Sequence, residues 1–281
     1  MRIVAIFAVY NERCFMPRVI RHLREQGVES YIIDNESTDG TRDIVDGLIG
    51  KGVIGVETLP RSGVFELEAQ LRRKEQLHHE LGADWYIHHD ADEIRQPPRP
   101  YATLAEAVRA VDRAGGNAID FHEFAFMPTA RDEDYEHDRY PEEMQYYCYI
   151  YRTTGARYRI NAWKNLGQEI DLASSGGHQV KFDSRRLFPE KFILRHYVAL
   201  SYDHILRKYC QRQFSQREVQ KGWFWTRATL RQEDIHFPDR KALKKLSADG
   251  DWDTSEPWTD EPIFKNAPRP VPGSGGRGPS Y

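Results

Sequence analysis

Short apolar runs alternate with amphipathic segments along the first 90 residues of the chain. Each run is short and continuous, which is typical of a strand buried on both faces. Between the runs, apolar residues recur at the spacing of one helix face. The predicted strands are residues 3–9, 31–33, 53–56 and 85–89, and the predicted helices are residues 16–23, 44–49 and 65–81.

Strands separated by helices predict a parallel sheet with right-handed crossovers. The expected fold class is therefore α/β, with a mostly parallel sheet flanked by helices. In such sheets, ligands bind beyond the carboxyl ends of the strands. Three polar clusters lie at predicted carboxyl ends, namely Tyr10-Asn11-Glu12, Asp34-Asn35 and Asp90-Ala91-Asp92. We expect these clusters to meet at one edge of the sheet.

Asp90 and Asp92 form an Asp-x-Asp pair directly after an apolar strand. Two close carboxylates repel each other unless a cation lies between them. Alternate residues of a strand point the same way, so both carboxylates are placed to reach one ion. Hard oxygen ligands suit Mg or Mn, which are often shared with a substrate diphosphate. His88 and His89 point to opposite faces, so we expect one to pack and one to lie near this site.

The second half of the chain is less regular. Residues 131–143 form a hydrophilic, acid-rich stretch, for which a solvated hairpin connection is favoured over an acceptor-binding lid. The C-terminal tail, residues 267–281, is rich in Pro, Gly and Ser and is predicted to be disordered. The other predicted elements are helices at residues 104–111 and 203–217 and strands at residues 118–126 and 146–151.

Composition narrows the class of protein. The 281 residues are 40% hydrophobic, which is enough for a real core in one large domain or two small ones. The net charge of -3 gives no electrostatic case for binding nucleic acid. No apolar stretch approaches the roughly 18 residues of a membrane span. The three cysteines are far apart, which indicates a reducing compartment and hence a cytoplasmic protein. Residues 223–225 (Trp-Phe-Trp) leave open a peripheral membrane role, although core packing is favoured for them.

Three segments, in this order and strand context, resemble the GT-A glycosyltransferases of the large family-2-like group. They are residues 9–12 (Val-Tyr-Asn-Glu), 33–41 (Ile-Asp-Asn-Glu-Ser-Thr-Asp-Gly-Thr) and 89–93 (His-Asp-Ala-Asp-Glu). The resemblance covers about residues 1–125. Two later echoes are similar to a bacterial subgroup, namely Gly176-Gly177-His178 and residues 194–197 (Leu-Arg-His-Tyr) followed by Ser201 and Lys208.

This resemblance implies a domain plan. Residues 1–200 would form the GT-A catalytic domain, with a nucleotide-sugar half at residues 1–125 and an acceptor half at residues 126–200. Residues 201–266 would form a helical C-terminal extension, ahead of the tail.

The resemblance also implies roles for individual residues. Val9, Tyr10, Asn11 and Glu12 would lie against the nucleotide base, and Tyr10 is either a base-stacking residue or a core aromatic. Asp34 or Asn35 would bond the base edge or the ribose, and Arg73 or Lys74 would approach the diphosphate. Asp90 and Ala91 would lie near the ribose and the metal, and Asp92 would be the stronger metal ligand. His196 or His178 would complete the metal or phosphate site.

Transfer from a sugar diphosphate builds negative charge on the leaving phosphate, which a metal ion and cationic side chains stabilise. An inverting transfer, expected from the resemblance alone, also needs a general base. The candidates are Asp120, Glu123, Glu169 and Asp171, with Glu169 and Asp171 favoured because they precede a Ser-Ser-Gly-Gly loop.

The expected function is transfer of a sugar from a UDP-, GDP- or dTDP-sugar to a glycan, lipid-linked or small-molecule acceptor. Two alternatives are a nucleotidyltransferase or a metal-dependent phosphohydrolase. The absence of glycine in residues 10–13 disfavours a nucleotidyltransferase. A third alternative is an inactive GT-A-like binding protein, against which the intact Asp-x-Asp argues.

Overall fold

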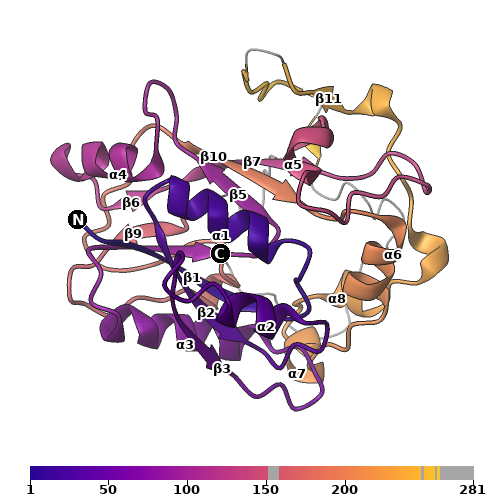
Figure 1. Cartoon of the computed structure of the whole chain (residues 1–281), viewed down its shortest axis with the longest axis horizontal. Coiled ribbons are helices and arrows are strands. Elements are labelled where there is room, and N and C mark those ends of the chain that lie inside the picture. Colours follow the sequence, from indigo (N-terminus) through magenta and orange to yellow (C-terminus); the bar gives the residue numbers. More distant parts are fainter. Residues whose placement is uncertain (151–157, 248–249, 257, 260–281) are drawn as a thin grey trace. The chain divides into compact units, whose positions relative to one another are not determined.

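The computed structural model describes residues 1–150, 158–247, 250–256 and 258–259 (Figure 1). These residues form two compact units. Unit 1 comprises residues 1–60, 67–123 and 158–196, and unit 2 comprises residues 61–66, 124–157 and 197–281. The predicted tail at residues 267–281 and the last residue of the strand predicted at 146–151 lie outside the described residues, as do residues 260–266 of the predicted extension.

Unit 1 is built on a six-stranded sheet in the order β3-β2-β1-β4-β9-β6. The strands β1 to β4 run parallel, and β9 runs antiparallel to both β4 and β6. The α/β prediction with a mostly parallel sheet is therefore confirmed. The strands are β1 (Ile3–Val9), β2 (Glu29–Asp34), β3 (Val53–Thr58), β4 (Trp85–His89), β6 (Ala118–Ile119) and β9 (Ala162–Lys164).

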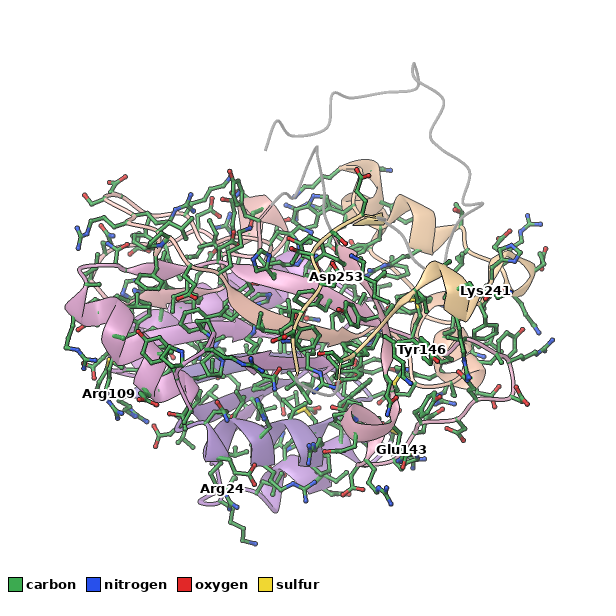
Figure 2. All side chains as sticks on the ribbon, turned by 90° about the horizontal axis from the view of Figure 1, so that it is seen from above. Arg24, Arg109, Glu143, Tyr146, Lys241 and Asp253 are labelled. Carbon is green, nitrogen blue, oxygen red and sulfur yellow. The ribbon has the colours of Figure 1, made fainter. Side chains whose placement is uncertain are left out.

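The helices α1 (Met16–Glu25) and α4 (Leu104–Arg113) bury apolar residues at the spacing that the sequence predicts. The prediction of a helix at residues 44–49 is wrong in its bounds, because the helix ends at Asp46 and Ile49 lies beyond it, 52% exposed. In α1, Met16, Val19, Ile20 and Leu23 are all buried. Charged side chains on the outer faces, such as Arg24, lie exposed and point away from the ribbon (Figure 2). The helices are α1 (Met16–Glu25), α2 (Thr41–Asp46), α3 (Leu67–Glu80) and α4 (Leu104–Arg113).

The strand order contains a topological switch at β1. The chain passes from β1 to β2 and β3 on one side, and then α3 leads back to β4 on the other side of β1. Leu71 and Leu77 of α3 share one hydrophobic cluster with Val4 and Ile6 of β1, so α3 covers that face of the sheet. Ligands of such sheets bind outside the carboxyl ends of the two strands that flank the switch. In this chain those ends are Val9 in β1 and His89 in β4.

Two strands that belong to a second sheet adjoin the Asp-x-Asp. The strand β5 (Glu93–Gln96) begins one residue after the Asp-x-Asp, and it pairs antiparallel with β10 (Phe192–Tyr197). The register places His196 opposite Glu93. Residues 104 positions apart in the chain, Asp92 and His196, are thereby brought together.

The prediction of a single strand at residues 118–126 is wrong. The segment divides at Asp120 into β6 and β7 (Phe121–Phe126). Asp120 is 1% exposed, and its carboxylate accepts hydrogen bonds from the backbone N–H groups of Phe121 and Arg159 at 2.9 and 2.7 Å. Backbone groups bonded to a side chain do not continue a ladder, so the strand is interrupted there.

Unit 2 contains short elements. Residues 131–143, expected to be irregular, end in a helical turn. The elements are α5 (Tyr140–Glu143), β8 (Tyr146–Ile150), α6 (Tyr202–Ile205), α7 (Gln216–Gln220), α8 (Trp225–Ala228), β11 (Lys244–Lys245) and β12 (Trp258–Thr259), with β8 antiparallel to β11 and parallel to β12.

The prediction of one helix at residues 203–217 is also wrong. After α6 the chain continues as a wide π-helical turn at Leu206–Cys210 and then leaves the helix. Phe65 donates a backbone hydrogen bond to Gln213 at 2.7 Å and accepts one from Ser215 at 3.0 Å. These bonds hold Phe214 in an extended bridge with Phe65, and the rings of Phe65 and Phe214 lie 5.9 Å apart. Tertiary pairing of residues 213–215 thus overrides their helical pattern.

Within residues 223–225, Phe224 packs by its ring between Phe65 and Phe214, at centroid distances of 5.5 and 5.1 Å. This contact agrees with the core-packing interpretation of Phe224. Across the described residues, no helix combines the length and the apolar character that crossing a bilayer requires.

Candidate functional site

The loop after β1 is joined by hydrogen bonds to the loop after β2. The backbone N–H of Asn11 donates to Ser37 Oγ at 3.0 Å, and Asn11 Oδ1 accepts from the Thr38 backbone N–H at 2.7 Å. The backbone N–H of Glu12 donates to Thr41 Oγ1 at 2.8 Å. Asn11 has a φ of 57°, a left-handed conformation that asparagine tolerates better than most residues. The two loops therefore form one braced rim at the carboxyl edge.

The side chain of Asn35 is bonded within the protein. Its amide N–H donates to the Leu59 carbonyl at 2.9 Å, and its Oδ1 accepts from Gln70 at 3.1 Å. The backbone N–H of Asn35 donates to the Val9 carbonyl at 2.8 Å, which ties the end of β2 to the end of β1. Asp34 is 3% exposed, and among the described residues its carboxylate accepts only long bonds of 3.3 and 3.4 Å, both from the backbone N–H of Ser37. Asp34 and Asn35 were the two residues predicted to contact the base or the ribose. The carboxylate of Asp34 is held by weaker hydrogen bonds than the side chain of Asn35, so it is the better acceptor for a ligand.

The two carboxylates of the Asp-x-Asp lie in different surroundings. The side chain of Asp90 is 54% exposed and lies 3.9 Å from both Lys74 Nζ and His88 Nε2. The side chain of Asp92 is 10% exposed, and its Oδ2 lies 3.2 Å from His196 Nε2. Ala91, between them, is buried. Each carboxylate therefore has its own basic neighbour.

His196 lies between two carboxylates. Its Nε2 contacts Asp92, and its Nδ1 contacts Glu123 Oε1 at 2.8 Å. Burial alone would lower the pKa of His196, but the Asp92 and Glu123 carboxylates raise that pKa well above its usual value. At neutral pH the imidazole is thus cationic when no metal is bound.

Lys74 is a buried cation beside the Asp-x-Asp. Its side chain is 1% exposed, and its Nζ contacts His88 Nδ1 at 2.9 Å and donates to the His89 carbonyl at 3.1 Å. Burial lowers the pKa of Lys74 to about 8, although the carboxylates of Asp90 and Glu93 oppose this shift. The amine is therefore largely protonated at neutral pH and is aimed at the end of β4.

The adjacent histidines divide as the sequence predicts. His89 is fully buried, and its ring packs on that of Phe7 at a centroid distance of 4.7 Å. His88 lies at the site, between Lys74 and Asp90. Burial, followed by the charges of Lys74 and Arg95, lowers the pKa of His88 well below its usual value, so this ring is neutral.

Other residues proposed from the sequence lie in different contacts. Arg73 pairs with Glu57 and Glu80 at 2.7 and 2.6 Å, so of the two basic candidates only Lys74 contacts the Asp-x-Asp segment. Glu169 has a side chain that is 93% exposed and lies 3.4 Å from His79. Asp171 accepts from the Ser174 backbone N–H at 2.9 Å. Their roles as general base stay predictions.

Sequence reasoning proposed His178 for the site and assigned no role to Arg159. The guanidinium of Arg159 contacts His178 Nδ1 and pairs with Glu123 at 2.7 Å. His178 thus reaches the same cluster as His196, through Arg159 and Glu123. Arg159 carried no sequence signal, because it stands alone in an irregular segment and its role depends on contacts with distant residues.

The donor set fits a divalent cation that is shared with a substrate. Mg and Mn commonly take one or two protein carboxylates, and substrate phosphates and water supply the other oxygens. Asp92 and His196 converge on one point, as two ligands of such an ion would. Among the described residues, no group of three His, Cys, Asp or Glu side chains is arranged to hold an ion by itself. Asp90 stays a predicted ligand, since its carboxylate lies toward Lys74 and His88.

Comparison with protein families gives one match. Residues 4–65 match Glycosyl transferase family 2. The match covers β1 to β3, including the rim of residues 10–13 and 37–41, and it ends before the Asp-x-Asp. It confirms the resemblance of the chain to family-2-like glycosyltransferases. No curated protein sequence matches the chain.

Several solved structures superpose on this chain in part. TarS from S. aureus is 12% identical, with a TM-score of 0.40, and the match covers 83% of this chain and 45% of TarS. TarS residues 1–349 in complex with UDP give 12% identity and a TM-score of 0.42, with 79% and 69% coverage. The mannosyltransferase PcManGT from Pyrobaculum calidifontis, solved with GDP-Man and Mn2+, gives 15% identity and a TM-score of 0.43, with 75% and 63% coverage. This chain thus spans less than half of the first of these TarS chains.

Proposed function

We propose that this chain is a metal-dependent glycosyltransferase that takes a sugar from a nucleotide-diphosphate sugar. The observation that carries the proposal is the contact of Asp92 with His196 at the carboxyl edge of the sheet, 3.2 Å apart. This pair lies beside the switch strands β1 and β4, and β1 belongs to the segment that matches Glycosyl transferase family 2. Fold, family segment and ligand pair thus support one site.

The residues divide the work of leaving-group departure. Negative charge develops on the diphosphate as the sugar–phosphate bond breaks, and groups that meet this charge lower the barrier. Lys74 supplies a buried cation beside Asp90. Asp92 and His196 would hold the ion, which acts as a Lewis acid on the phosphate oxygens when bound. Burial of Lys74 and Asp92 strengthens these interactions, because water screens them less.

The base end of the donor would lie at the braced rim. Asp34 is the preferred contact for a base edge or ribose, since Asn35 is bonded to Leu59 and Gln70. Tyr10, half-buried at the end of β1, is the predicted stacking residue. The donor is predicted to be a UDP-, GDP- or dTDP-sugar. The acceptor, whether glycan, lipid-linked or small, and the inverting course stay predictions, as do the acceptor half at residues 126–200 and a cytoplasmic or peripheral location.

The alternative of a nucleotidyltransferase is disfavoured by the loop after β1. Such enzymes need a loop whose backbone N–H groups cradle phosphates. Here the backbone N–H groups of Asn11 and Glu12 already donate to Ser37 and Thr41. No contact of the described residues favours a phosphohydrolase or an inactive binding protein.

The test is nucleotide release from a panel of nucleotide sugars with Mn or Mg present. We expect release from at least one donor, and we expect Asp92→Asn to lower it at least about 100-fold, because the ion and the diphosphate lose their shared ligand. Asp84→Asn is the matched control: Asp84 lies directly before β4, at its opposite end, and accepts from the Arg2 backbone at 2.6 Å. Full release by Asp92→Asn in the presence of EDTA would contradict the proposal.

A further inference from the structure

Four residues from separate parts of unit 1 form a continuous line of contacts behind Asp92. His196 contacts Asp92 through Nε2 and Glu123 through Nδ1, at 3.2 and 2.8 Å. The other oxygen of Glu123 pairs with Arg159 at 2.7 Å, and Arg159 contacts His178. Asp92, His196 and His178 were expected at the metal or phosphate site, whereas Glu123 was expected only as one of four general-base candidates and Arg159 was not expected there. Glu123 and Arg159 therefore need an explanation of their own.

Glu123 is held by both of its oxygens. Its side chain is 6% exposed, and a buried carboxylate is stable only when it is paired. Oε1 faces the imidazole of His196, and Oε2 faces the guanidinium of Arg159, whose side chain is 13% exposed. Two partners on two oxygens fix the orientation of the carboxylate group. The same two contacts occupy the oxygens that a general base would use on an acceptor hydroxyl.

The orientation of Glu123 determines that of His196. A ring that donates its Nδ1–H to a fixed carboxylate presents Nε2 on its opposite side, here toward Asp92. Histidine ligands of metals commonly donate the other ring N–H to a carboxylate in this way, and loss of that partner weakens metal binding. We propose that Glu123 is a positioning residue that holds His196 toward Asp92, and that Arg159 holds Glu123 in place. This inference rests on the proposed function, in which Asp92 and His196 serve the ion and the diphosphate.

The first test needs no metal and no activity. Glu123→Leu removes the acceptor at similar volume, whereas Glu123→Gln keeps an acceptor oxygen. In proton NMR spectra of the metal-free protein, we expect a slowly exchanging Nδ1–H signal of His196, assigned by its loss in His196→Gln. The signal should persist in Glu123→Gln and vanish in Glu123→Leu. A signal that survives in Glu123→Leu would overturn the proposal, and this result does not depend on whether the protein transfers sugars.

The second test measures Mn2+ binding by calorimetry. We expect Glu123→Leu to raise the dissociation constant about 10- to 100-fold and Glu123→Gln to raise it less. The matched controls are Glu75→Leu and Glu75→Gln. Glu75 is another buried glutamate of unit 1, and it accepts from the backbone N–H groups of Leu172 and Ala173. The controls should lose stability but keep their Mn2+ affinity. Equal weakening in both pairs would show a merely structural effect and overturn the proposal.

The third test separates positioning from base catalysis. If Glu123 positions His196, Glu123→Gln needs more Mn2+ for half-maximal activity but recovers kcat to within about threefold at saturating metal. If Glu123 were the general base, kcat would fall about 100-fold or more at every Mn2+ concentration. Glu123→Gln retains the size of the side chain and one acceptor oxygen. This variant can therefore distinguish positioning from base catalysis even if Glu123→Leu does not fold.

Discussion

Lys74 and His196 are the cationic side chains that contact the Asp-x-Asp segment, and the protein holds them differently. His196 gains its charge from the Asp92 and Glu123 carboxylates. Lys74 contacts His88 and a backbone carbonyl, which are both uncharged, and the Asp90 carboxylate lies 3.9 Å away. These contacts therefore offset only part of the free energy that burial of the charged amine costs. A diphosphate at this edge would supply the missing countercharge.

The incomplete compensation of Lys74 predicts a pH effect on stability. Burial lowers its pKa in the folded protein to about 8, from 10.5 in the unfolded chain. Between these values the unfolded state binds a proton that the folded state does not, so stability rises with pH. Relative to Lys74→Met, the wild type should gain on the order of 3 kcal/mol between pH 7 and pH 11. Urea unfolding of both proteins across this range measures the gain, and a constant difference would contradict it.

Sequence reasoning reached some of these residues and not others. Asp92 was proposed because it follows the strand predicted at residues 85–89, and strand ends meet at one edge. His196 was proposed from the resemblance, as one of two candidate histidines. Spacing alone could not decide whether Lys74 or Arg73 approaches the diphosphate, because the two residues are adjacent. The fold shows that Arg73 pairs with Glu57 and Glu80. Glu123 was known only as one of four general-base candidates. Its contact with His196 joins residues 73 positions apart, which no local pattern encodes.

The loop that follows the 3-10 turn at Ala173–Ser175 is the element that brings His178 toward the site. Gly176 and Gly177 both have left-handed backbone, with φ of 62° and 81°. At Gly177 a Cβ would lie 2.9 Å from His88 Nε2 and 3.1 Å from Leu71 Cδ2, whereas at Gly176 the nearest atom is 4.0 Å away. The carbonyl of Gly177 also accepts from Asn161 at 2.7 Å. Close packing against His88 therefore requires glycine at position 177.

The two glycines provide a matched pair of substitutions. Gly176→Ala should cost about 1 kcal/mol from backbone strain alone. Gly177→Ala should cost about 1–3 kcal/mol more, because the new methyl group displaces His88 or Leu71. Thermal and urea unfolding measure both values. Equal losses of stability would show that the approach to His88 does not constrain this loop.

At the scale of elements, the strands and helices of the first 113 residues were largely predictable, and two longer segments, residues 118–126 and 203–217, were not. The predicted helix at residues 16–23 and strand at residues 85–89 correspond to α1 and β4, because burial of one face or of both faces leaves a clear pattern. The break at Asp120 and the bridge at Phe214 depend on bonds to Arg159 and Phe65, which lie far away in the sequence. Tertiary hydrogen bonds of this kind override local propensity.

At the scale of the molecule, the contacts described above among Lys74, His88, Asp90, Asp92, Glu123, Arg159, His178 and His196 all lie within unit 1. Donor with Mn2+ should therefore slow amide hydrogen exchange at the ends of β1, β2 and β4, where residues 9–12, 34–41 and 88–93 lie. In the first turns of α6 and α7, which belong to unit 2, the rate of amide exchange should be the same with and without the donor. Hydrogen-exchange mass spectrometry with and without the donor measures this pattern. Protection confined to unit 2 would place the nucleotide elsewhere.

The most direct measurement of the central claim is calorimetric titration of a nucleotide diphosphate into the wild type and Asp92→Ala, with and without Mn2+. The account predicts that Mn2+ tightens binding to the wild type at least about tenfold, because the ion links Asp92 to the diphosphate, and that this gain disappears in Asp92→Ala. Asp84→Ala should keep the gain, since Asp84 lies at the opposite end of β4. Nucleotide affinity that does not depend on Mn2+ in the wild type, or that Asp92→Ala leaves unchanged, would contradict the account.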